Sequence, residues 1–142
     1  MLRVLRPGGA LWLQTQTPHQ HMEGFWWTPI IPRAAAVLAA RFAGPPELAA
    51  QLQEAGFAAV ASEVPPETLV SAPFYLDPHG PFEETFRNGD STWSLATPSE
   101  LEAGLKWWRT VVDAGGAEAY LEEREAVRAR VGQTTAVIAT KA

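Results

Sequence analysis

The sequence contains no cysteine, which excludes disulfides, thiolate metal sites and cysteine nucleophiles and is compatible with the reducing cytoplasm. No apolar run approaches the roughly 20 residues that a membrane span needs, and the N-terminus lacks the pattern of a secretory signal. Basic residues are fewer than acidic ones, 11 Lys and Arg against 16 Asp and Glu, and the net charge is -5. We therefore expect a cytoplasmic protein with neither a membrane nor a nucleic acid as partner.

Tryptophan and proline are plentiful instead. The 142 residues suit one domain, and 46% hydrophobic with 19% charged residues is typical of a globular chain. Six Trp and twelve Pro are many for this length. Indole rings at this density indicate an aromatic core or an apolar pocket, and the core is the favoured interpretation.

Three segments predict β-strands. Residues 10–17 (ALWLQTQT) follow a Pro-Gly-Gly turn and place Leu11 and Leu13 at alternate positions. Residues 57–64 (FAAVASEV) end at a pair of prolines, and residues 134–140 (TTAVIAT) are rich in β-branched side chains. The sequence therefore predicts an α/β protein with a very small sheet.

Four segments predict helices, and the clearest start is Thr97-Pro98-Ser99-Glu100. Thr97 can accept a hydrogen bond from the N–H of Glu100, whose side chain can return to the N–H of Thr97. Trp108 continues the apolar stripe of this helix and is expected in the core, whereas Trp107 lies about 100° away around the axis. The predicted helices span 33–43, 46–55, 98–113 and 117–130, and we expect 18–32 and an insert at about 66–96 to be irregular.

Residues 2–17 (LRVLRPGGALWLQTQT) resemble a segment of class I S-adenosylmethionine-dependent methyltransferases, in which a basic-Pro-Gly-Gly turn leads into the fifth strand. Residues 48–60 (LAAQLQEAGFAAV) resemble the helix that ends in Glu-Ala-Gly-Phe and enters the sixth strand. Residues 134–142 would be the seventh strand, which in that family runs antiparallel between the other two. The resemblance implies one incomplete domain, 1–142, with a partial Rossmann-like methyltransferase fold: a small mixed sheet corresponding to strands 5, 6 and 7, flanked by helices, without the N-terminal half.

The absent half is the one that holds the cofactor in that family, through a Gly-rich turn after the first strand and an acidic residue after the second. Gly8-Gly9 precedes a strand and Gly115-Gly116 joins two helices, so neither pair has the required context. The resemblance implies S-adenosylmethionine as cofactor. We expect no cofactor-binding residue in this chain, and no binding by this chain alone.

His19 and His21 follow the strand at 10–17, at the edge where open α/β sheets bind ligands. In the family this edge faces the methyl acceptor, so the resemblance implies that His19 or His21 orients the acceptor or takes a proton from it. A metal site with Glu23 is an alternative, but it needs a third strong ligand that the sequence does not offer. Both histidines could also be ordinary surface residues of a loop.

Further substrate-binding candidates are aromatic or lie in the insert. Trp26 and Trp27 either line an apolar acceptor pocket or anchor the helix that follows. Arg87, Asn88 and Asp90 flank a strong turn signal, Asn-Gly-Asp-Ser, in the region between the sixth and seventh strands where the family varies its acceptor site. The alternative for this segment is a capped loop without a ligand. No residue is assigned a catalytic role, and no metal is expected.

The strand at 10–17 would be interior in a complete fold, so its exposed edge predicts a homo-oligomer or a swapped assembly. The leading hypothesis is methyl transfer to a small-molecule acceptor by a longer protein, of which this chain is an inactive C-terminal fragment. An alternative is a non-catalytic methyltransferase-like module that acts through dimerisation or sheet completion. A third is a hydrolase or lyase that uses the histidine segment. The acceptor and the methylated atom stay open.

Overall fold

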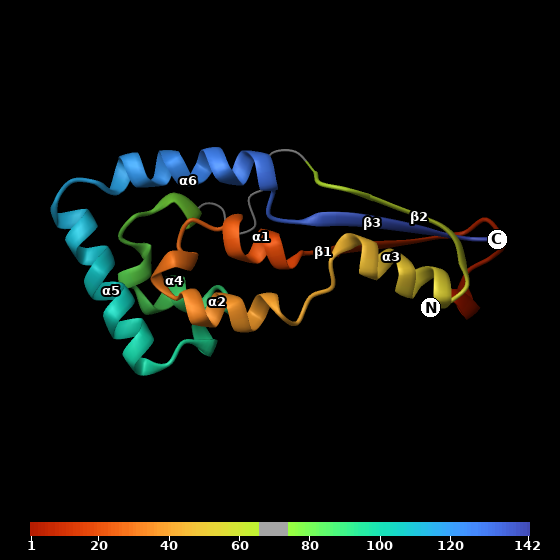
Figure 1. Ribbon diagram of the computed structural model, residues 1–142, viewed down its shortest axis with the longest axis horizontal. Coiled ribbons are helices and arrows are strands. Elements are labelled where there is room, and N and C mark those ends of the chain that lie inside the picture. Colours follow the sequence, from red (N-terminus) through yellow and green to blue (C-terminus); the bar gives the residue numbers. More distant parts are fainter. Residues whose placement is uncertain (66–73) are drawn as a thin grey trace.

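The computed structural model describes residues 1–65 and 74–142 and has an elongated shape (Figure 1). One end is a three-stranded sheet with helix α3 (Pro45–Glu54), and both chain termini lie at this end. The other end is a helical lobe. It contains α1 (Pro18–Glu23), α2 (Pro32–Ala39), α4 (Glu84–Asn88), α5 (Pro98–Asp113), α6 (Ala117–Val131) and several single 3-10 turns. Within the described residues, no helix is both long and apolar enough to cross a membrane.

The sheet contains β1 (Ala10–Thr15), β2 (Phe57–Glu63) and β3 (Thr135–Lys141) in the order β1-β3-β2. The predicted position of the last strand between the other two is confirmed. The register pairs Leu11 and Val60 with Ala139 from opposite sides. Both ladders are antiparallel, so the expectation of a mixed sheet is wrong for the described strands: β1 and β2 run parallel to each other but do not touch.

Helix α3 covers one face of the sheet. Its residues Leu48 and Leu52 pack in a cluster with Leu11, Leu13 and Val137. The chain then turns into β2 at Gly56, whose φ of 98° is a left-handed conformation that favours glycine. The side chains of β1 alternate between the two faces of the sheet, which places Trp12 on the face away from α3, where it is 64% exposed.

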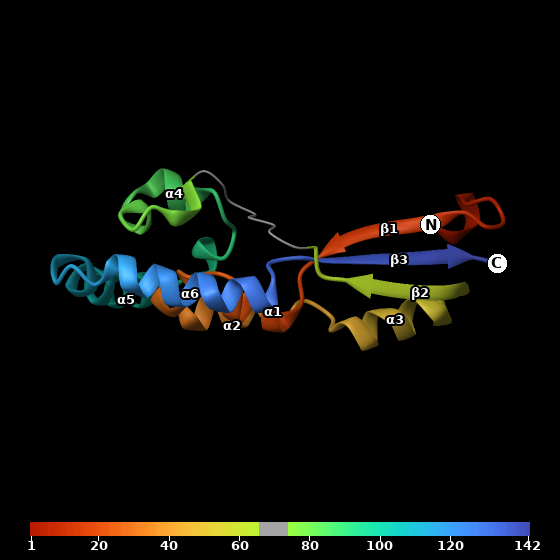
Figure 2. The same cartoon turned by 90° about the horizontal axis from the view of Figure 1, so that it is seen from above.

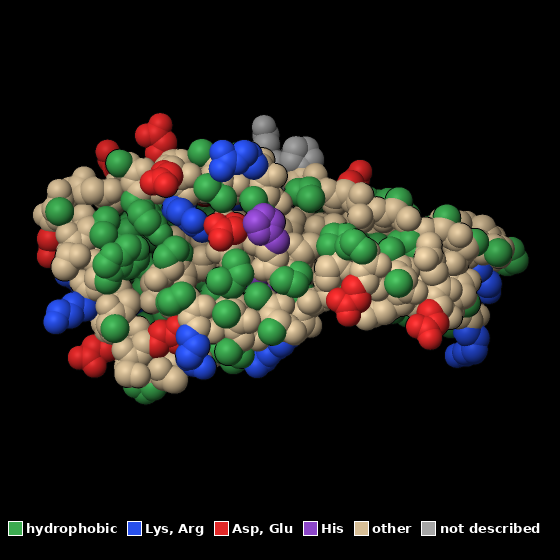
Figure 3. Space-filling model, in the orientation of Figure 1, with side chains coloured by type: hydrophobic (Ala, Val, Ile, Leu, Met, Phe, Trp, Pro, Cys, Tyr) green, Lys and Arg blue, Asp and Glu red, His purple; other side chains and the backbone are tan. Residues whose placement is uncertain are grey.

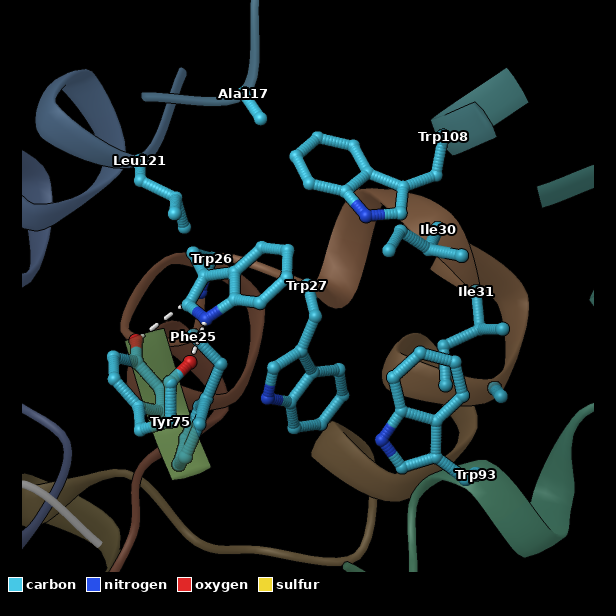
Figure 4. Packing of buried hydrophobic residues seen from close by; sticks show 11 residues of the cluster. Phe25, Trp26, Trp27, Ile30, Ile31, Tyr75, Trp93, Trp108, Ala117 and Leu121 are labelled. Atoms are coloured by element: carbon cyan, nitrogen blue, oxygen red, sulfur yellow. Dashed lines mark hydrogen bonds between the residues drawn. The ribbon is translucent and has the colours of Figure 1, made fainter. Parts of the chain in front are cut away.

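The helical lobe has its own core, built mainly from aromatic rings (Figure 4). Trp108 is fully buried in it, as predicted, and lies 5.2 Å from Trp26 between ring centroids. Gly104 lets α5 approach the backbone of Ile30 closely, because a Cβ atom at this position would collide with the Ile30 carbonyl oxygen. The core contains Phe25, Trp26, Trp27, Ile30, Ile31, Ala34, Tyr75, Trp93, Trp108, Ala117 and Leu121.

Helix α1 lies where the sequence predicted an irregular segment. Thr17 accepts a hydrogen bond from the N–H of Gln20 (3.1 Å), and the Gln20 side chain accepts one from the N–H of Thr17 (3.0 Å). The Gln20 amide also donates to the Thr134 carbonyl oxygen (2.9 Å), which ties α1 to the start of β3. The short helix is therefore stabilised by a capping box and by a tertiary contact together.

The Glu100 side chain has different hydrogen-bond donors from the one that the sequence predicts. Thr97 caps α5 as expected, by accepting a hydrogen bond from the Glu100 N–H. The Glu100 carboxylate, however, accepts hydrogen bonds from the backbone N–H groups of Arg33 (2.7 Å) and Ala34 (3.1 Å). It thus satisfies free donors at the first turn of α2, which has no side-chain cap of its own.

The predicted insert at about 66–96 falls partly outside the described residues, since 66–73 are not among them. Its remainder consists of 3-10 turns at Phe74–Leu76, Gly80–Phe82 and Trp93–Leu95 around α4. Figure 2 shows this segment as a separate layer beside the larger helices of the lobe. The longest regular element in its described part is the five-residue α4.

Candidate functional site

Helix α1 carries both candidate histidines from the end of β1 into the lobe, but it places them differently. His19 is exposed, whereas His21 is 5% exposed, with ring centroids 4.4 Å from Phe42 and 6.3 Å from Phe25. Burial lowers the pKa of His21, and the charge of Asp90 acts against this shift. The His21 Nε2 atom has no hydrogen-bond partner among the described residues.

Trp26 belongs to the core of the lobe. Its indole N–H donates to the Tyr75 carbonyl oxygen, and its backbone N–H donates to the Tyr75 hydroxyl oxygen at 3.2 Å (Figure 4). The Tyr75 hydroxyl in turn donates to the Gly24 carbonyl oxygen (3.2 Å). Burial raises the pKa of Tyr75 well above its ordinary value and that of Tyr120 to about 12. Both hydroxyls therefore stay protonated at neutral pH and serve as structural donors.

Two hollows lie beside α4 and share the side chains of Phe74, Thr85 and Phe86. The first measures about 260 Å³ and is also lined by Asp77, Gly80 and Glu83. The second measures about 200 Å³ and is also lined by Trp27, Gly89, Asp90 and Trp93. The structure thus brings two predicted residues, Trp27 and Asp90, to one hollow although they are far apart in the sequence.

A third hollow of about 340 Å³ shares Asp90 and Trp93 with the second. It is lined by all three candidates of the insert, Arg87, Asn88 and Asp90. The Arg87 guanidinium donates to the Pro81 carbonyl oxygen (2.6 Å), which uses one of its donors within the loop. The sequence offers two alternatives for this segment, a capped loop and a substrate-binding segment. The two are compatible, because Arg87 bonds within the loop and also lines the hollow.

Trp93 was not among the sequence candidates, although it ends the segment that contains them. Its side chain lines the second and third hollows and is 5% exposed, and its indole N–H has no hydrogen-bond partner among the described residues. Asp90 was a candidate, and its Oδ1 atom accepts hydrogen bonds from the Thr92 N–H (2.8 Å) and hydroxyl (2.6 Å). Fixed aromatic walls, a fixed carboxylate and a free donor can hold a small molecule in one orientation.

The outer surface of the lobe is also apolar in places. Figure 3 shows hydrophobic side chains gathered beside α5 on one face of the molecule. Trp107 is 39% exposed and packs edge-on against Tyr120, with 5.9 Å between ring centroids. In residues 1–65 and 74–142, nowhere do three or more His, Cys, Asp or Glu side chains form a group that could hold a metal ion.

The described residues do not fit the binding of S-adenosylmethionine as the family resemblance implies it. Gly8 (φ 73°) lies in the turn before β1, and Gly115 (φ 73°) lies between α5 and α6. The end of β1 passes into α1 through Gln16 and Thr17, without a glycine. In the part of the chain that the structure describes, no glycine-rich turn leads from a strand into a helix, so none offers a close backbone approach to such a cofactor.

A known protein resembles this chain in its structure. No family model matches the sequence, and no curated protein matches it. A crystal structure of a protein from Anabaena variabilis, assigned as a methyltransferase from an antibiotic biosynthesis pathway, matches with a TM-score of 0.74 at 21% sequence identity. The match covers 100% of this chain and 58% of that chain. This chain therefore has a methyltransferase-like fold, and it spans little more than half the length of the methyltransferase that it matches.

Proposed function

We propose that this chain takes part in S-adenosylmethionine-dependent methyl transfer to a small-molecule acceptor, in the cytoplasm, as the C-terminal part of a longer methyltransferase. The observation that carries the proposal is the fold likeness over the whole chain to a methyltransferase that is considerably longer. The assignment of that protein to antibiotic biosynthesis supports a small molecule as acceptor. Alone, the chain is expected to be inactive.

In this proposal the helical lobe provides the acceptor side of the site. Ligands of open α/β folds bind beyond the carboxyl ends of the strands, and the carboxyl end of β1 leads directly into α1 and the lobe. The hollows beside α4 lie in the same lobe and contain Trp27 and Asp90. Methyl transfer depends chiefly on holding the acceptor in line with the donor, so positioning residues suffice on this side.

The sheet supports a longer parent in a second way. In the described structure β1 pairs only with β3, so one of its edges carries unpaired N–H and C=O groups. Such an edge accepts a further strand readily. A preceding segment that adds strands to β1 would complete the sheet and would bring the cofactor-binding residues with it.

The test is calorimetric titration of S-adenosylmethionine into this 142-residue chain and into the same chain extended by its upstream coding sequence. We expect no binding by the shorter chain and micromolar binding by the extended one, with adenosine triphosphate as a control ligand that lacks the sulfonium. Clear binding by the shorter chain would contradict the proposal that the cofactor site lies outside it. A stop codon in frame close upstream would favour the alternative below.

The alternative is a non-catalytic module that acts through dimerisation or through completion of another chain's sheet. The exposure of Trp12 on edge strand β1, on the sheet face away from α3, favours it. Sedimentation velocity should then show a wild-type dimer, which Trp12→Glu converts to a monomer. Trp107→Glu changes an exposed Trp of the lobe and should leave the dimer intact. A monomeric wild type would contradict self-assembly.

A further inference from the structure

The two adjoining hollows beside α4 combine aromatic and acidic walls. Phe74 and Phe86 line both, and Trp27 and Trp93 line the second. Three acidic side chains complete the walls: Asp77 and Glu83 in the first hollow and Asp90 in the second. Among the described residues, no Lys or Arg lines either hollow. Aromatic faces together with carboxylates, without a competing cation, attract a positively charged ligand.

Asp90 is held in place by its own loop. Its Oδ1 atom accepts two hydrogen bonds from Thr92, one from the backbone N–H and one from the hydroxyl. Both bonds go to the same oxygen, so Thr92 leaves Oδ2 without a hydrogen bond from its own groups. Thr92 is itself buried, at 2% exposure, so the orientation of this carboxylate is set before any ligand arrives.

The indole N–H of Trp93 is an independent sign of a ligand. The side chain is 5% exposed, and its Nε1 atom has no hydrogen-bond partner among the described residues. Figure 4 shows this nitrogen on the side of the ring that faces Trp27. The two rings are tilted by 36° with centroids 5.2 Å apart, a geometry that does not direct the N–H at the face of Trp27. Buried donors without a partner are uncommon in native proteins, so an acceptor atom from a ligand would satisfy this one.

We propose that these hollows form a binding site for a small organic ammonium compound that carries an oxygen atom a few bonds from its charge. The aromatic rings and the Asp90 carboxylate receive the ammonium group, and the Trp93 N–H donates to the oxygen. Volumes of about 260 and 200 Å³ suit a molecule of this size. The identification of this compound as the methyl acceptor rests on the proposed function, whereas its binding does not.

The first test compares choline with 3,3-dimethylbutan-1-ol, an uncharged molecule of nearly the same shape, by calorimetry and tryptophan fluorescence on the full chain. Choline should bind roughly tenfold more tightly, since cation–π and carboxylate contacts act only on the charged compound. Equal binding of the two, or no binding of choline, would overturn the proposal. Equal binding would mean that the hollows bind both molecules through apolar contacts alone.

Two variants locate the site. Asp90→Asn keeps an oxygen that can accept from Thr92 but removes the charge, so it should weaken choline binding roughly fivefold and leave 3,3-dimethylbutan-1-ol unaffected. Asp113→Asn makes the same change at an exposed position at the end of α5 and should have no effect. If both variants weaken choline binding equally, the effect is one of net charge and the assigned site is wrong.

Trp93→Phe tests the donor while it keeps an aromatic wall. We expect weaker binding of choline but little change for tetramethylammonium, which has no oxygen to accept the hydrogen bond. An equal loss for both ligands would contradict the assigned role of the N–H. These outcomes do not depend on S-adenosylmethionine, so the binding site can fail while the methyl-transfer proposal stands, and the reverse also holds.

Discussion

The helical lobe and the sheet bury their apolar surface in different ways. The lobe packs aromatic and aliphatic side chains from five segments around Trp26 and Trp108, both almost fully buried. The sheet has a smaller core, whose buried residues are Leu52, Phe57, Val137 and Ala139. Its other face leaves Trp12 largely exposed. A lobe with a closed core can hold a ligand site of its own. A sheet that is covered on one face and, among the described strands, unpaired at the outer edges of β1 and β2 still has surface for a partner.

The largest expected effect is the difference in stability loss between replacing the buried Trp108 and replacing the exposed Trp12. Trp108→Ala removes a fully buried ring and its hydrogen bond to the Pro78 carbonyl oxygen (2.7 Å), so we expect it to lower the free energy of unfolding by about 3–5 kcal/mol. Trp12→Ala removes an exposed ring and should cost no more than about 0.5 kcal/mol. Urea unfolding followed by circular dichroism measures both. Similar losses for the two variants would mean that Trp12 is packed in solution and that the sheet is not open.

A smaller effect tests the contact between Glu100 of α5 and the first turn of α2. Glu100→Ala should lower the free energy of unfolding by about 1 kcal/mol, because it leaves the Arg33 and Ala34 N–H groups at the start of α2 without their acceptor. Glu102→Ala, at an exposed position of the same helix, is the matched control and should be nearly neutral. Thermal or urea unfolding distinguishes the two. An equal effect would assign the loss to α5 itself and not to its contact with α2.

The smallest expected effect concerns pH. Burial lowers the pKa of His21 in the folded chain, so the unfolded chain binds a proton at a higher pH than the folded one. The contribution of His21 to stability is therefore complete above about pH 6.5 and is lost as the pH falls from there through the lowered pKa. His21→Gln should make the free energy of unfolding less dependent on pH between 7.5 and 5, whereas His19→Gln, at an exposed position, should not. Identical pH dependence in wild type and His21→Gln would contradict this role.

Two copies of one local signal show where sequence reasoning succeeded and failed. Thr97-Pro98-Ser99-Glu100 was recognised as a helix start, and α5 begins there, but Thr17-Pro18-His19-Gln20 has the same pattern and was expected to be irregular. The first precedes a long apolar stripe, whereas the second precedes only six helical residues, which need Thr134 and the lobe to hold them. A capping box alone therefore indicates where a helix can start, not whether it forms.

The residues that line the second hollow were likewise predicted only in part from the sequence. Trp27 and Asp90 were predicted from separate arguments, and the structure brings them to one hollow. Trp93 and Phe86 complete that hollow but carried no signal of their own, because an aromatic residue in a core and one at a pocket wall look alike in sequence. Trp26, predicted with Trp27, is taken into the core by Tyr75. Neighbouring residues on a turn point in different directions, and only packing decides which of them faces a hollow.

The sequence by itself determined the three strands, the start and length of α5, and the glycine turn between α3 and β2, because alternation, capping and left-handed backbone are local properties. The tertiary structure decided which backbone N–H groups donate to the Glu100 carboxylate, which histidine is buried, and which aromatic rings surround a hollow. These outcomes depend on contacts between residues distant along the chain, such as Arg33 with Glu100 and Trp27 with Trp93. Such contacts leave no periodic trace in the sequence, since each is made once and by side chains that suit many other environments.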